Sequence, residues 1–414
     1  MTEKRIEVMA PVGSFEALEA AIGAGCDSIY FGVEQLNMRS RAASNFTREE
    51  LPELAERCQS AGVRMYLTMN TLLYDHDMSL MRDILAQARD VSVSAVIVSD
   101  MAAIQVASEL GVPVHCSTQL SISNYETVKF YSRFAETIVL ARELDLRMVK
   151  RICDQIKAED LRGPGGDLVQ IEIFGHGALC VAQSGRCGMS QFQYNASGNR
   201  GACLQPCRRE YRITDKETGE SLDLEDGFVL SPQDLCTIGI LPEVVDAGVA
   251  VLKIEGRGRE PLYVKRTVEC YREALDAIAE GAYTPEKVEG WRERLETVYH
   301  RGLGEGWYMG KSMPELAGID GSQATQKKFF VGEVVNYYRK IGVAEVQVQA
   351  RGFQSGEPFV CIGSKTGAVE GVVAGLRCAD QEVGAAEPKT VVTLRVPDRV
   401  RIKDKFFVLE ERAG

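Results

Sequence analysis

The sequence predicts an α/β fold, with a closed (β/α)8 barrel of the TIM type followed by a small all-β barrel domain. Across the first 260 residues, short apolar runs rich in β-branched side chains alternate with amphipathic stretches of helical period. Eight such repeats indicate a parallel sheet covered by helices, and a closed barrel is the simplest arrangement for them. The last segment has short alternating runs without helices between them, as in all-β domains.

Each predicted strand is a short apolar run bounded by turn residues. The eight strands are Ile6–Ala10, Ser28–Gly32, Arg64–Met69, Ala95–Ser99, Pro113–Cys116, Thr137–Leu140, Val169–Phe174 and Val249–Ile254. The segment Phe15–Cys26 is amphipathic, and Thr47 with Glu50 forms a capping box that opens the next helix. A doubly wound open sheet is the alternative arrangement of these elements.

The same pattern predicts the domain boundaries. A catalytic domain spans residues 1–300 and carries a Cys-rich loop at 175–235, after the seventh strand. A loop of this length usually has a function or a small structure of its own. The Gly-rich residues 301–326 are predicted to be a linker, and residues 327–414 the β-barrel domain, with strands in VGEVVNYY, AEVQVQA, TVVTLRV and KFFVLE.

Composition limits the location and the partners of the protein. The 414 residues include 48 Lys/Arg and 59 Asp/Glu, a net charge of −11 that argues against a general nucleic-acid binder. Residues 325–414 hold 14 basic and 11 acidic residues, a balance of +3 that permits a local anionic partner. The opening MTEKRIEVMAPVGSF has charges where an export signal needs an apolar core, so we expect a cytoplasmic protein without a membrane partner. Its twelve cysteines are then expected to be reduced thiols.

Polar side chains follow the predicted strands, where barrel enzymes place their chemistry. The candidate substrate-binding residues are Arg39, Arg41, Asn70, Gln119, Arg142, Lys253 and Arg257. His176 and Glu255 are the candidates for proton transfer. Each residue alone is an ordinary cap or turn residue, and their shared position is what indicates a site.

Four cysteines fall within 28 residues of the Cys-rich loop. They are Cys180, Cys187, Cys203 and Cys207, called the cysteine quartet below. Buried apolar thiols fit poorly in a loop rich in Gly and Asn, and one nucleophile paired with His176 would leave three thiols unexplained. Metal binding explains all four, and the spacing favours an iron–sulfur cluster over zinc while leaving both open. Four arginines of this loop would offset cluster charge or hold an anionic substrate: Arg186, Arg200, Arg208 and Arg209.

Several blocks of the sequence resemble peptidase family U32, the collagenase-like proteases. The most specific are IEIFGHGALCVAQSGRCGMS, followed by NRGACLQPCRREY, and VLKIEGRGREPLYVKRTV; the blocks LSPQDLC, LNMRSRAASNF and MAPVGSFEALEAAIGAGCDSIYFGV are also similar. The resemblance covers nearly the whole chain, including the C-terminal domain.

The resemblance implies more than one activity. The family name implies a peptidase, whereas other branches are oxygen-independent hydroxylases. The branch of similar size and C-terminal domain implies conversion of the tRNA wobble uridine to 5-hydroxyuridine, with prephenate as co-substrate. Further branches hydroxylate a ribosomal RNA cytidine or a quinone precursor. A zinc-stabilised RNA-binding module without catalysis is a third possibility.

The resemblance also implies a cofactor and its ligands. It places a [4Fe–4S] cluster on the cysteine quartet and adds an electron donor or cluster-assembly proteins to the partners tRNA and prephenate. Cys236 lies outside this pattern and is expected to be structural.

One basic stretch of the C-terminal domain is a candidate for holding tRNA. The basic residues at every second position of RVRIKDK are Arg399, Arg401, Lys403 and Lys405. A strand has a period of two, so these side chains would share one face, with Val400, Ile402 and Phe406 on the buried face. We interpret the stretch as a phosphate-binding stripe, and a solvated edge that blocks aggregation is the alternative.

Overall fold

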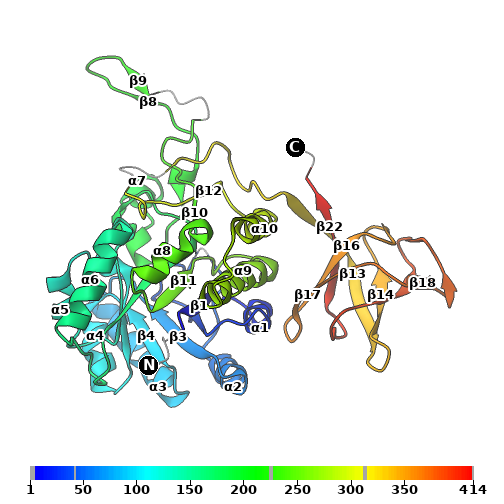
Figure 1. Ribbon diagram of the computed structural model, residues 1–414, viewed down its shortest axis with the longest axis horizontal. Helices are drawn as coiled ribbons and strands as arrows, with labels where there is room; N and C mark the ends of the chain where they lie inside the picture. Colours follow the sequence, from blue (N-terminus) through cyan, green and yellow to red (C-terminus); the bar gives the residue numbers. More distant parts are fainter. Residues whose placement is uncertain (1–4, 42, 223–226, 311–314, 413–414) are drawn as a thin grey trace.

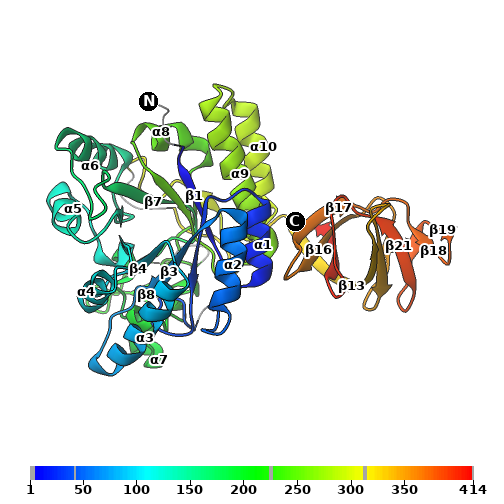
Figure 2. The ribbon, with the colours of Figure 1, turned by 90° about the horizontal axis from the view of Figure 1, so that it is seen from below.

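The computed structural model describes residues 5–41, 43–222, 227–310 and 315–412. Within these ranges, eight parallel strands form the barrel: β1 (Glu7–Pro11), β2 (Ser28–Gly32), β3 (Arg64–Met69), β4 (Ala95–Val98), β5 (Val114–Cys116), β6 (Thr137–Val139), β7 (Gln170–Gly177) and β11 (Val251–Ile254). Strand β11 pairs with both β1 and β7, which closes the sheet. The predicted (β/α)8 barrel is therefore confirmed. The C-terminal β domain of the same chain lies beside the barrel (Figures 1 and 2).

Helices cover the outside of the barrel. They are α1 (Phe15–Gly23), α2 (Leu51–Ala61), α3 (Met78–Asp90), α4 (Met101–Glu109), α5 (Tyr125–Tyr131), α6 (Leu146–Ala158), α8 (Leu241–Asp246), α9 (Pro261–Ala279) and α10 (Pro285–Glu296). Thr47 and Glu50 exchange the two hydrogen bonds of a capping box ahead of α2, at 2.8 and 3.3 Å, as predicted. Among the described residues, no helix is both long enough and apolar enough to cross a membrane.

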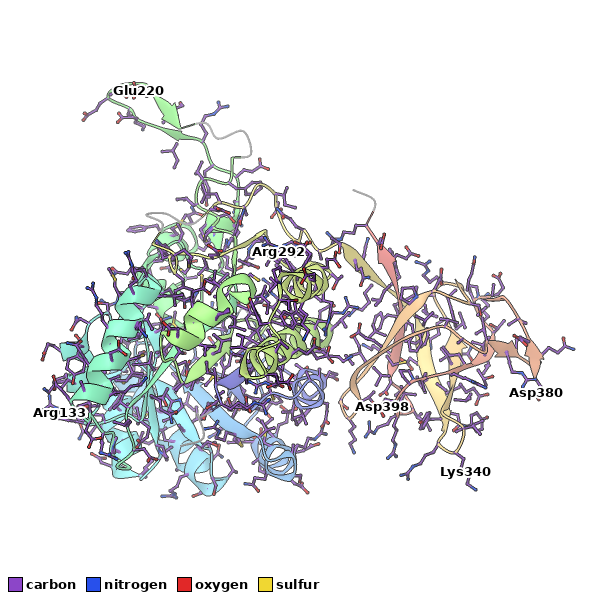
Figure 3. The ribbon with its side chains drawn as sticks, in the orientation of Figure 1. Arg133, Glu220, Arg292, Lys340, Asp380 and Asp398 are labelled. Carbon is purple, nitrogen blue, oxygen red and sulfur yellow. The ribbon has the colours of Figure 1, made fainter. Side chains whose placement is uncertain are left out.

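The loop after β7 has a small structure of its own. It contains α7 (Met189–Tyr194) and the strand pair β8 (Ile213–Thr214) and β9 (Ser221–Leu222), which form an arm with Glu220 at its tip (Figure 3). The chain then returns as β10 (Asp234–Cys236), antiparallel to β7. Strand β12 (Leu303–Gly304) pairs with β10, so the start of the predicted linker belongs to the barrel sheet.

The C-terminal domain is all-β, as predicted. Its main strands are β13 (Gln326–Tyr338), β14 (Val343–Val348), β16 (Pro358–Gly363), β17 (Gly367–Val372), β18 (Arg377–Cys378), β19 (Gln381–Glu382), β21 (Val391–Arg395) and β22 (Lys405–Glu411). They form one antiparallel sheet in the order β17-β16-β22-β13-β14-β21-β18-β19, and β15 (Phe353–Gln354) pairs separately with β20 (Ala385–Ala386). Phe359 and Phe406 stack in its core at 5.0 Å between ring centroids. Strands β16 and β17 were missed by the sequence reading.

The β16–β17 hairpin attaches this domain to the side of the barrel, against α1 and α9 (Figure 2). Gly367 has φ +71°, and a Cβ there would lie 2.7 Å from the backbone N of Ala20, so this close approach requires glycine. Lys265 and Arg266 of α9 both pair with Glu370 of β17. Apolar residues of β16, β17 and β22 also join the hydrophobic core of the barrel.

Candidate active site at the carboxyl end of the barrel

A pocket of about 160 Å³ lies where the carboxyl ends of the barrel strands meet the Cys-rich loop. The predicted residues that line it are Arg39, Asn70, Gln119, Arg142, Lys253, Glu255 and Arg257. They come from five segments that are distant in the sequence, and the closed sheet brings the ends of those segments together. Asn70 also links two of the segments, because its Oδ1 accepts the Met38 N–H and its Nδ2 donates to Ser117 Oγ.

All four thiols of the cysteine quartet line this pocket. Each is half-buried, and none is in a disulfide. The Met189 N–H lies 3.4 Å from Cys187 Sγ and donates to it. Burial raises the pKa of the Cys207 thiol, and the other three cysteines raise it further, whereas Arg208 opposes the rise. The fold therefore gathers the quartet at one site, as the spacing suggested.

The geometry of the quartet bears on the kind of metal group that it could hold. In the part of the chain that the structure describes, no three His, Cys, Asp or Glu side chains are grouped to hold one metal ion. Tetrahedral zinc needs thiolates that converge on one atom. An iron–sulfur cluster takes each thiolate on a different iron, so its ligands can surround a larger volume.

The pocket is strongly cationic, although the chain as a whole has a net charge of −11. Its charged lining residues among those described are the cations Arg39, Arg142, Arg208, Lys253 and Arg257 and the acid Glu255. Such a concentration of positive charge in a concave site attracts anions. A small anionic substrate would therefore be favoured here.

Glu255 is better placed to hold arginine than to move protons. Its Oε1 lies 3.0 Å from Arg39 Nη2. Burial pushes its pKa up, but Arg39, Arg259 and Arg142 outweigh burial and lower the pKa to about 2. The group is a carboxylate at neutral pH, and so low a pKa suits a general acid or base poorly. Burial also lowers the pKa of Arg257 to about 10, which leaves it cationic.

Lys253 lies deeper, on β11, and pairs with Glu172 on β7. The distance from Nζ to Oε1 is 2.7 Å, and both side chains are buried. The ammonium also lies 4.4 Å from the centre of the Tyr30 ring. Burial lowers the pKa of Lys253, while the attraction of Glu172 acts in the opposite direction. The sequence analysis did not identify Glu172. Its charged side chain within the apolar run IEIF could have indicated a buried ion pair.

His176, the other residue predicted to transfer protons, does not line the pocket. Strand β7 extends to Gly177, three residues beyond the predicted end, so His176 belongs to the strand rather than to the loop. Its side chain is buried between the rings of Tyr263 and Tyr271, and Nδ1 lies 3.4 Å from the Tyr271 hydroxyl. Burial lowers its pKa to about 3, so the ring is neutral at physiological pH.

Arg41 also lies outside the pocket, contrary to the prediction. Its side chain is exposed and lines a neighbouring pocket of about 450 Å³ together with Arg200 and Thr71. The cause is local, because the Arg41 N–H donates to the Gly201 carbonyl and turns this segment toward the Cys-rich loop.

The predicted basic strand of the C-terminal domain is wrong. Residues 399–404 belong to no strand, a turn joins Arg401 to Asp404, and β22 begins only at Lys405. Asp404 is buried and accepts the Arg401 N–H at 2.7 Å, which closes the turn, and Lys403 has φ +74°. Ile402, expected to be buried, is 62% exposed.

The basic residues of this turn therefore do not form a stripe on one face. Arg401, Lys403 and Lys405 line a groove of about 670 Å³ between the two domains, together with Lys328 and Lys365. Arg399 is exposed and does not line this groove.

Comparison with known proteins decides the family. The model of the family described as "Peptidase family U32" matches residues 13–317, which is most of the chain. The chain belongs to peptidase family U32.

Two kinds of relative appear within this family. The U32 chain is 45% identical to a protein named Collagenase from Porphyromonas gingivalis, over 100% of both chains. It is 31% identical to tRNA hydroxylation protein P1 of Bacillus subtilis, over 86% of this chain and 82% of that one. It is 33% identical to the 23S rRNA 5-hydroxycytidine C2501 synthase of Escherichia coli, over 73% of this chain and 45% of that one.

Two further polar residues of the U32 pocket, Tyr30 and Thr68, were not predicted as site residues, whereas Arg208 was among the arginines expected near the quartet. Tyr30 and Thr68 lie within β2 and β3 and line the pocket from inside the barrel. Arg208 donates to Ser231 Oγ at 3.0 Å and to the carbonyl of Pro232 at 2.6 Å. The prediction considered residues that follow strands, whereas Tyr30 and Thr68 could have been found as polar groups within buried strands.

Proposed function

We propose that this U32 protein is an oxygen-independent hydroxylase that converts the wobble uridine of tRNA to 5-hydroxyuridine, with prephenate as co-substrate. The observation that carries the proposal is one pocket lined by five cationic side chains and by all four thiols of the cysteine quartet. Prephenate is a dicarboxylate, and arginine binds carboxylates through paired hydrogen bonds. The relatives named for tRNA and rRNA hydroxylation support RNA as the class of substrate.

The quartet would hold a [4Fe–4S] cluster, which would supply one-electron transfer when bound. Its ligation by four cysteines favours this role over binding of substrate at an open iron. Half-burial of the thiols and the nearby Arg208 are suited to a cluster of negative charge.

Three arginines of the pocket have donors left for the carboxylates. Arg39 uses Nη2 for Glu255, Arg142 uses Nη1 for the Ala178 carbonyl, and Arg257 uses Nη1 for Thr68 Oγ1. The Nε of Arg142 is buried and has no hydrogen-bond partner among the described residues, and a bound carboxylate would supply one. Lys253 also lines the pocket, where its ammonium is paired with Glu172.

A peptidase is the second candidate, because the 45% identical relative is named Collagenase. A cysteine nucleophile needs an adjacent base, usually histidine. All four histidines of the chain belong to the described residues, and none of them lines the pocket. We therefore rank the peptidase below the hydroxylase.

The test is an anaerobic assay on tRNA that lacks the modification, with and without prephenate, and with 5-hydroxyuridine measured by nucleoside mass spectrometry. Changing Arg142 to Met should lower kcat/KM for prephenate by about 10- to 150-fold, as expected for losing a hydrogen bond to a charged group. Arg133→Met is the matched control, since Arg133 lies on the outer surface of the barrel (Figure 3). Gelatin is assayed in the same preparation, and gelatin cleavage without nucleoside product would replace the hydroxylase with the peptidase.

A further inference from the structure

The Cys-rich loop exposes an apolar surface next to the pocket. Phe192 on α7 is 91% exposed, and Tyr194 and Leu204 are also exposed. These three residues are called the α7 patch. Ser190 of the same helix lines the pocket, and its Oγ accepts the Leu204 N–H at 3.0 Å. Patch and pocket therefore belong to one small structural unit, and Figure 1 shows the helix α7 of this unit.

Phe192 lies next to a segment that lines the pocket. A Cβ built on Gly188 would come within 2.9 Å of the Phe192 ring, so the ring lies over this glycine. The neighbours of Gly188 in the chain, Cys187 and Met189, both line the pocket. Single exposed apolar residues are ordinary on protein surfaces. A nearly fully exposed aromatic ring beside a cationic pocket is a more specific feature. A partner that covers the ring would remove it from water, and this burial would favour binding.

The part of the loop nearest the patch carries most of its arginines. Residues 175–211 contain four arginines and one acidic residue, although the complete loop, residues 175–235, has six basic and eight acidic residues. Arg186 and Arg209 are exposed, whereas Arg200 is paired with Asp77. Two of these arginines lie over aromatic rings, Arg209 at 5.2 Å from the centre of Tyr194 and Arg200 at 3.9 Å from the centre of Tyr74. Flat rings interleaved with guanidinium groups match the bases and phosphates of single-stranded nucleic acid.

We propose that Phe192 stacks on a base of a single-stranded RNA loop, next to the base that enters the pocket. The inference rests on the proposed function and names the surface that would receive the RNA. A base within a duplex cannot reach an enclosed pocket, so enzymes that modify bases act on unpaired or extruded ones. When one base of the RNA loop enters the pocket, the base next to it loses a stacking partner. Stacking on Phe192 would replace that lost contact.

The test uses the full chain and a fluorescently labelled anticodon stem–loop RNA. Phe192→Ala should raise the Kd by about 5- to 150-fold, the effect of losing one base–aromatic stack, while Phe192→Trp should bind like the wild type. Ile341→Ala is the matched control, because Ile341 is an exposed apolar residue on the separate β domain and its loss should leave the Kd unchanged. An abasic nucleotide at the stacked position should weaken binding by the wild type and have no effect on Phe192→Ala.

The possible results test the stacking contact and the proposed hydroxylase function separately. Equal Kd values for the wild type and Phe192→Ala would overturn the stacking contact. Gelatin binding that depends on Phe192, with RNA binding that does not, would assign the patch to a protein partner and also overturn it. Formation of 5-hydroxyuridine by the wild type on the same RNA is measured separately. Binding that depends on Phe192 without any product would refute the proposed function while the stacking contact stands.

Discussion

Replacing Lys253 with Met should destabilise the barrel by about 3–5 kcal/mol, because the Glu172 carboxylate would remain buried without its partner. The Lys253 and Glu172 side chains are 6% and 0% exposed, with 2.7 Å between Nζ and Oε1. The other carboxylate oxygen of Glu172 has no hydrogen-bond partner among the described residues. No second donor is therefore in place to compensate for the lost ammonium.

The expected magnitude follows from the geometry of the pair. Two unit charges 2.7 Å apart attract by about 6 kcal/mol at an effective dielectric constant of about 20. Part of this attraction offsets the cost of burying both charges, and breaking the pair removes the attraction while that cost remains for Glu172. Methionine fills nearly the same volume as lysine, so a cavity adds little.

The measurement is urea unfolding followed by circular dichroism. Lys129→Met is the matched control, since Lys129 and Glu159 also lie 2.7 Å apart but are 49% and 48% exposed. Water screens that pair, so its loss should change the unfolding free energy little. The double variant Lys253→Met/Glu172→Leu should recover most of the stability, because no charge is then left buried. The reasoning is refuted if Lys253→Met is tolerated as well as Lys129→Met, or if the double variant is no more stable than the single one.

Three other predictions concern the cofactor, the pH dependence and the RNA. Alanine at any one position of the cysteine quartet should lower the bound iron per chain after anaerobic purification, whereas Cys236→Ala, whose thiol is buried near Tyr271, should keep it. Iron lost only in Cys236→Ala would mean that the ligand assignment is wrong. Burial lowers the pKa of both His115 and His176 to about 3, below the ordinary 6.5, so between these values the unfolded chain binds more protons and stability falls as the pH is lowered. Urea unfolding at about pH 7.5 and about pH 5.5 should show a loss of about 1.4 kcal/mol for each of these two histidines. His115→Phe should remove about 1.4 kcal/mol of that loss, and stability that rises on acidification would contradict this account. Changing Arg401, Lys403 and Lys405 to Glu should weaken tRNA binding and lower the slope of log K against log salt by up to about 0.9 per lost phosphate contact, with iron content unchanged. Binding curves that overlay the wild type at low and high salt would remove the groove between the domains from RNA binding.

The sequence by itself determined the barrel, because its signals are local. A period of two or of 3.6 in hydrophobicity can be read within a few residues, and strands β2 and β3 have the bounds that were predicted. The capping box at Thr47 and Glu50 needs only a spacing of three residues. The cysteine quartet could be identified for the same reason, since its four members lie in one loop.

The set of pocket residues was also largely determined by the sequence, for a topological reason. In a closed parallel barrel the carboxyl ends of all strands meet, so Arg39, Arg142 and Arg257 were expected together and all line the pocket. That inference needs the order of the elements and no knowledge of their packing.

Only the tertiary structure decided the burial and the partners of several residues whose role the sequence left open. His176 changed from a loop residue to a buried strand residue because β7 continues for three residues more, which depends on its pairing with β10 and β11. Glu172 and Lys253 became an ion pair through the register of β7 against β11. The turn at Arg401 replaced a strand because the buried carboxylate of Asp404 accepts its N–H. Strand register and burial depend on partners far along the chain, so hydrophobic periodicity, which is a property of neighbouring residues, cannot determine them.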